Sequence, residues 1–200
     1  MHYDRFTRLL HLFVATGIVA QLAFSLVMVH PKPGRAGDLF YALHESLGQV
    51  LLGLLVVHWL WCLVRPGNID FALLFPWFSP SRYQAIQEDM KSYFSHAMRF
   101  SLPENSQVSP LASAVQGLGL LVATLLGVSG VILFLGMEPD GGMGGWLHDV
   151  KEGHEVLGSL LWCYLIVHAT MAILHQLAGH NSMGAMVKVW KKDSEPTAEG

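Results

Sequence analysis

The sequence predicts an all-α integral-membrane protein built as a four-helix bundle. Of its 200 residues, 52% are hydrophobic and only 14% are charged, and the mean hydropathy is +0.40. Soluble domains usually carry about 25% charged residues, so the surplus of apolar side chains must face something other than water. Four apolar runs are each long enough to cross a bilayer, and they cover residues 9–29, 44–64, 114–135 and 154–178. Because a bilayer offers the backbone no water, we expect each run to be an α-helix.

The predicted helices are separated by segments that break a helix or are polar. The first and second are joined by HPKPGRAGD at 30–38, and the second stops at RPGN, 65–68. The long inner loop covers 65–113, and its middle, SRYQAIQEDMKSYFSHAMRF at 81–100, mixes apolar and charged residues at helical spacing. Two interpretations of that middle stay open: an amphipathic helix on the inner membrane surface, or a helix packed on the domain.

The third helix contains no histidine, and its VSG at 128–130 suits close helix packing. The outer loop that follows, GMEPDGGMGGWLHDVKEG at 136–153, is glycine-rich and acidic, and it is a candidate docking surface for a partner subunit. The chain closes with the polar stretch DSEPTAEG. We therefore expect one transmembrane domain over 1–180 and a cytoplasmic tail over 181–200.

Positively charged residues predict which side of the membrane each loop occupies, because loops rich in Lys and Arg stay in the cytoplasm. The side that holds both termini and the long loop carries Arg5, Arg8, Arg65, Arg82, Lys91, Arg99, Lys188, Lys191 and Lys192. The opposite side carries only Lys32, Arg35 and Lys151. We expect a multi-pass protein of the bacterial cytoplasmic (inner) membrane with both termini in the cytoplasm.

Two of the predicted helices carry the same histidine pattern. HESLGQVLLGLLVVH at 44–58 and HEVLGSLLWCYLIVH at 154–168 both open with His-Glu and close with Val-His. A spacing of fourteen residues advances a helix by about 21 Å and returns to nearly the same face. Each helix therefore presents one histidine near each side of the bilayer.

The depths of these histidines match between helices. The second and fourth helices run parallel, so His44 lies at the depth of His154, and His58 at the depth of His168. His11, near the inner end of the first helix, also falls near the depth of His168. Two imidazoles at one depth can bind one haem iron axially, and two such pairs would form an electron path across the membrane.

Neighbouring residues favour haem over a bare metal ion. Gly48 and Gly158 each follow a histidine by four residues and remove a side chain where a macrocycle must approach. No CxxCH motif is present, which argues against covalently attached haem. A histidine-lined path for protons or metal ions is the alternative, because an intramembrane histidine usually has a partner. His175 faces the inner boundary, where it could touch a quinone or the lipid headgroups.

The chain resembles the prokaryotic di-haem cytochrome b561 group, which includes the b-type cytochrome subunits of nickel–iron hydrogenases and of formate dehydrogenases. The resemblance is carried by RLLHLF at 8–13, ALHESLG at 42–48 and the HEVLG…VH of the fourth helix, and it covers most of 5–178. The RYQAIQEDMKSYF loop followed by SPLASAVQ is also similar to the hydrogenase and formate dehydrogenase branch. This resemblance implies a four-helix core that holds two haem b groups.

The resemblance also implies a ligand set. His44 and His154 would hold the outer haem iron, and His11 and His168 the inner one. His58 departs from the family pattern and is the alternative to His11, as in larger cytochromes in which two helices supply all four ligands. If His11 is the ligand, His58 would hydrogen-bond a propionate or take part in quinone protonation.

Two arginines near the inner boundary are candidate partners of the haem propionates, namely Arg8 and Arg65. Plain positive-inside anchoring is the equal alternative for each of them.

The function implied is electron transfer across the membrane between an extracytoplasmic redox partner and the quinone pool. The partner would be a hydrogenase-like or other dehydrogenase subunit, or a cytochrome c, which makes the chain the electron-transfer subunit of an oxidoreductase complex. A homo-oligomer is possible within the lipid bilayer, and no nucleic acid is expected. One alternative is a stand-alone superoxide:quinone oxidoreductase, but the outer loops carry more acidic than basic residues and would repel the anion. Another is a haem-free transporter or membrane anchor.

Overall fold

Five α-helices make up the part of the chain that the structure describes. The computed structural model describes residues 4–32, 34–64, 76, 79–98, 109–138 and 142–179. The helices are α1 (Arg5–Val27), α2 (Leu39–Val64), α4 (Pro80–Ala97), α5 (Pro110–Gly136) and α6 (Gly145–Leu177). α1, α2, α5 and α6 are long and apolar enough to cross a membrane. The predicted all-α class with four membrane-spanning helices is therefore confirmed.

Polar caps, rather than the limits of the apolar runs, determine where two of these helices begin. Asp4 precedes α1 and accepts the backbone N–H of Thr7 at 2.8 Å. Ser109 precedes α5 and accepts the N–H of Ala112 at 3.0 Å, while Pro110 occupies the first helical position. Both arrangements satisfy N–H groups that have no partner within the helix. α1 and α5 consequently start before the apolar runs that the sequence marks.

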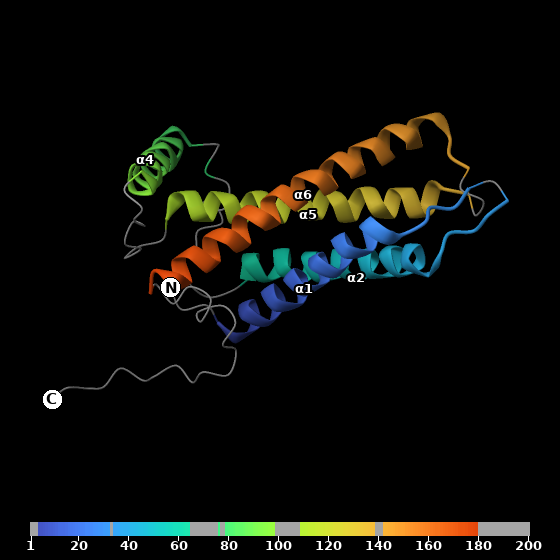
Figure 1. Cartoon of the computed structure of the whole chain (residues 1–200), viewed down its shortest axis with the longest axis horizontal. Helices are drawn as coiled ribbons and strands as arrows, with labels where there is room; N and C mark the ends of the chain where they lie inside the picture. Colours follow the sequence, from blue (N-terminus) through green and yellow to red (C-terminus); the bar gives the residue numbers. More distant parts are fainter. Residues whose placement is uncertain are drawn as a thin grey trace.

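The four long helices lie side by side along the long axis of the molecule (Figure 1). Close backbone packing joins α1 to α2, α2 to α5 and α5 to α6. α6 packs far less closely against α1 and α2, although it lies across the bundle from them. The backbone of α6 thus lies farther from α1 and α2 than from α5, and side chains bridge the wider gap.

The buried core is small and lies where three helices meet. Leu22 of α1, Val122 of α5 and Leu161 of α6 form its buried cluster. Many large apolar side chains of the described residues are exposed, including Leu26, Val64 and Leu135. Such outward apolar faces are expected for helices surrounded by lipid.

α4 lies at the end of the bundle where α5 begins and α6 ends (Figure 1). It packs on α5, and the hydroxyl of Tyr93 lies 3.4 Å from Nε2 of His175 on α6. Tyr83, Met90 and Phe94 are exposed on α4. The spacing of seven and then four residues places these three on one helical face. α4 is therefore packed on the domain through one face and presents an apolar stripe on another.

Candidate functional site

The outer histidine pair is brought together by α2 and α6. The ring centroids of His44 and His154 lie 6.3 Å apart, and the ring planes are inclined by 77°. Both side chains are half-buried. Because the two helices run in the same direction, the turns that carry these histidines reach the same depth. The structure thus places side by side the two residues that the sequence assigns to the outer site.

The inner pair is formed by His11 on α1 and His168 on α6. Their ring centroids lie 6.4 Å apart, with the planes inclined by 60°. The ring of Tyr164 stacks on that of His168, with centroids 5.4 Å apart and an interplanar angle of 14°. His58, the other candidate, is half-buried on α2. The contact between His11 and His168 gives His11 the geometry expected of a residue of the inner site.

These separations fit axial coordination of a single iron by each pair. A metal–imidazole bond is about 2.0 Å long and the ring centre lies about 1.15 Å behind the nitrogen, so two axial rings have centroids about 6.3 Å apart. The observed separations are 6.3 Å and 6.4 Å. Within the described ranges, no group of three or more His, Cys, Asp or Glu residues could hold a metal ion. A haem iron needs only two protein ligands, because the macrocycle supplies the other four nitrogens.

Gln21 of α1 connects directly to His44 and was not assigned by the sequence. Its side-chain amide donates to the backbone carbonyl of His44 at 2.7 Å. The backbone carbonyl of Gln21 lies 3.3 Å from Nδ1 of the His44 ring. A carbonyl oxygen only accepts, so Nδ1 of His44 carries the proton and Nε2 carries the lone pair. A second hydrogen bond of this kind commonly orients a metal-binding histidine.

The two glycines predicted to make room for a macrocycle have different surroundings. A Cβ atom added at Gly158 would meet nothing within 4 Å. A Cβ added at Gly48 would lie 3.0 Å from the amide nitrogen of Gln21. Gly158 therefore borders open space as expected, whereas Gly48 allows α1 to approach α2.

Arg8 and Arg65 are the predicted propionate partners. Arg8 is buried, with 7% of its surface exposed, and lies one turn before His11 on α1. A buried guanidinium needs polar partners within the protein or its cofactor. An arginine that only anchors a helix at the lipid headgroups has no such need. Arg65 lies outside the described residues.

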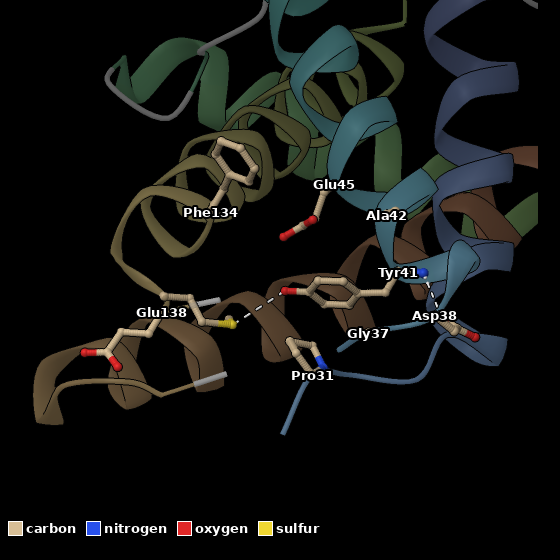
Figure 2. Close-up of a pocket in the computed structure, with 9 residues that line it drawn as sticks. Pro31, Gly37, Asp38, Tyr41, Ala42, Glu45, Phe134 and Glu138 are labelled. Atoms are coloured by element: carbon tan, nitrogen blue, oxygen red, sulfur yellow. Dashed lines mark hydrogen bonds between the residues drawn. The ribbon is translucent and has the colours of Figure 1, made fainter. Parts of the chain in front are cut away.

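A pocket of about 370 Å³ opens at the end of the bundle where α2 begins and α5 ends, beside the turn that carries His44 (Figure 2). Its lining comes from the α1–α2 loop, the start of α2 and the end of α5: Pro31, Gly37, Asp38, Tyr41, Ala42, Glu45, Phe134, Met137 and Glu138. The hydroxyl of Tyr41 points to the sulfur of Met137 at 3.6 Å. The backbone N–H groups of Tyr41 and Val29 donate to Asp38 and hold the pKa of its carboxyl below the usual value. Three carboxyl groups thus line the pocket next to the outer pair.

Comparison with known proteins identifies one family. The family model described as prokaryotic cytochrome b561 matches residues 2–188. No curated protein and no solved structure matches the chain.

Proposed function

Because the chain belongs to the prokaryotic cytochrome b561 family and is a membrane-bound b-type cytochrome of electron transfer, we propose that it carries electrons between an extracytoplasmic redox partner and the quinone pool. Bound haem supplies reversible one-electron chemistry at its iron. The chain itself provides the axial ligands, the depth of each site and an apolar surround. The single observation that carries the proposal is the spacing of the two histidine pairs, 6.3 Å and 6.4 Å between ring centroids.

The chain binds two haem b groups in this proposal, one at each side of the membrane. His44 and His154 hold the outer one, and His11 and His168 hold the inner one. The spacing of fourteen residues from His154 to His168 separates the sites by about 21 Å along α6. His58 then lies beside the inner site without ligating, as a hydrogen-bond partner of a propionate or a proton carrier for quinone. In this proposal Arg8 and Arg65 neutralise propionates at the inner side.

Quinone is reduced or oxidised at the inner end of the bundle. His175 supports this placement, because it is buried two turns beyond His168 on α6 and contacts the hydroxyl of Tyr93. Quinone chemistry needs a group that exchanges protons, and a histidine next to a phenol hydroxyl can do so near neutral pH. In this proposal the exposed apolar stripe of Tyr83, Met90 and Phe94 on α4 lies against the membrane from which a quinone arrives.

The redox partner binds at the outer end. The pocket is lined by Glu45 and Glu138, and Glu45 directly follows the proposed ligand His44 in the chain. A partner bound in this pocket would therefore be close to the outer site. The carboxyl groups of this end favour a partner with basic side chains over a small anion such as superoxide. A dehydrogenase subunit or a cytochrome c meets this requirement, and the chain is then the electron-transfer subunit of that complex in the bacterial inner membrane.

Haem counting tests the proposal. The pyridine haemochrome spectrum of the purified full chain is expected to give two b haems per chain. His154→Ala should lose one of them, because the variant removes one axial ligand of the outer pair. His148→Ala, an exposed histidine on the same helix, is the matched control and should keep both. A wild-type chain that carries no haem would overturn the proposal and leave the histidines to a proton or metal-ion path.

A further inference from the structure

The VSG segment of α5 lies against the outer ligand His154. The hydroxyl of Ser129 is 2.8 Å from Nδ1 of His154, and it is 3.1 Å from the backbone carbonyl of Leu126 one turn earlier. A Cβ added at the next residue, Gly130, would lie 3.4 Å from Cε1 of the same ring. The small residues of this segment thus form the surface on which the His154 ring rests.

One arrangement of the protons gives each of these three groups a hydrogen-bond partner. The carbonyl of Leu126 can only accept, and the Ser129 hydroxyl has a single proton. When Ser129 donates that proton to Leu126, its oxygen is left to accept, and the donor must be the Nδ1–H of His154. The lone pair of His154 is then on Nε2, and a ring nitrogen with a lone pair is the atom that binds a metal.

We propose that Ser129 is a positioning residue for the outer site: it fixes the tautomer of His154, raises the basicity of its Nε2 and lowers the reduction potential of the haem held there. The inference rests on the proposed function, since it concerns the haem of the outer pair. A hydrogen bond accepted from the far nitrogen of a ligating histidine makes the ring a stronger electron donor. Stronger donation favours the oxidised iron, and hydrogen bonding around a ligand is one of the means by which a protein adjusts haem potential.

The inner pair differs from the outer pair in the hydrogen bonds of its rings. Among the residues that the structure describes, the side chains of His11 and His168 make no comparable hydrogen bond, and His168 instead stacks on Tyr164. The two sites therefore differ in the electron-donating strength of their ligands. This difference places the lower potential at the outer site, so that transfer from the outer to the inner end is favoured.

Spectroscopic redox titration of the purified full chain tests the inference. In Ser129→Ala, one of the two haem components should shift to higher potential while the other stays unchanged. The component that disappears in His154→Ala identifies the outer haem. Ser129→Thr keeps a hydroxyl that can bond an earlier carbonyl, so it should restore the wild-type potential.

Ser25→Ala is the matched control. Ser25 is half-buried in α1 and donates to the carbonyl of Leu22 at 2.8 Å, the same i−3 contact that Ser129 makes, but without a histidine partner. Its removal should leave both potentials unchanged. Unchanged potentials in Ser129→Ala, or an equal shift in Ser25→Ala, would overturn the inference while the two-haem function stands.

If Ser129→Ala loses the outer haem, Ser129→Thr decides the question. Retention of both haems at wild-type potentials supports the positioning role, and a loss equal to that of the alanine variant refutes it. A wild-type chain without haem would instead remove the proposed function itself.

Discussion

His11 and His168 face each other between α1 and α6 with ring centroids 6.4 Å apart. This contact supports the proposal that His11, rather than His58, holds the inner iron. His11→Ala should lower the haem content of the purified chain from two to one, because it removes an axial ligand. His58→Ala should keep both haems, because both axial ligands of each pair remain. Haem loss in His58→Ala with retention in His11→Ala would mean that α2 and α6 hold both groups.

Tyr164 is held between His168 and Gly119. A Cβ at Gly119 would overlap Cζ of Tyr164, so Gly119→Ala must displace the phenol ring that stacks on His168. Overpacking of this kind typically costs about 1–3 kcal/mol. We expect Gly119→Ala to have a lower thermal unfolding midpoint in detergent and to lose the inner haem faster than the wild type. Both changes can be measured from the haem absorption spectrum.

Gly53→Ala is the control for this variant, since an added Cβ there meets nothing within 4 Å. Alanine is a better helix former than glycine, so Gly53→Ala should leave stability unchanged or slightly raise it. Tyr164→Phe keeps the stacked ring and should behave as wild type. An unaffected inner haem in Gly119→Ala would show that the stacking contributes nothing to the site.

His175 and Tyr93 provide a test of the inner quinone site. If His175 exchanges protons with quinone, His175→Ala should slow quinol-driven haem reduction by roughly 100-fold, the low end of what a positioned acid or base contributes. The haem count should not change. His96→Ala is the matched control at the same end of the bundle, because Nδ1 of His96 contacts the Ser92 carbonyl of its own helix. Wild-type quinol kinetics in His175→Ala would place the quinone elsewhere.

The membrane-spanning architecture could be predicted from the sequence because it depends on length and hydropathy alone. The juxtaposition of His44 with His154 also follows from simple geometry, since parallel helices with the same spacing bring matching turns to the same depth. Depth could not distinguish His11 from His58, because that choice depends on which helix lies opposite His168. Packing of this kind is a tertiary property that periodicity does not contain.

The supporting residues were missed for a related reason. Gln21 and Ser129 are ordinary polar residues in apolar helices. Only the neighbouring helix shows that the backbone carbonyl of Gln21 and the hydroxyl of Ser129 each contact a histidine ring. Tyr164 precedes His168 by four residues, a spacing that could have indicated contact on one helix face. Gly48 was assigned to a macrocycle, but the amide of Gln21 occupies the space beside it.

The orientation of the bundle can be tested with single cysteines. After Cys62 and Cys163 are replaced by alanine, Glu152→Cys introduces an exposed thiol at the predicted outer end of α6, and Ser81→Cys introduces one on α4. A membrane-impermeant maleimide added to intact spheroplasts should label Glu152→Cys only. Ser81→Cys should react after permeabilisation, because the positive-inside rule places α4 in the cytoplasm. The opposite labelling pattern would invert the topology and place the partner on the cytoplasmic side.

The carboxylate of Asp89 on α4 forms hydrogen bonds with the start of α5. It accepts the backbone N–H of Leu111 at 3.1 Å and the hydroxyl of Ser109. A carboxylate at a helix N-terminus also interacts favourably with the helix dipole. Loss of a helix cap typically costs about 1 kcal/mol, which corresponds to an increase of about fivefold in the open population. Asp89→Ala should therefore speed tryptic cleavage at Arg82 and Lys91 by about fivefold.

Glu88→Ala removes the same charge from an exposed neighbouring position and should leave the cleavage rate unchanged. Equal cleavage in both variants would mean that α4 is held by its apolar contacts with α5 rather than by the Asp89 cap.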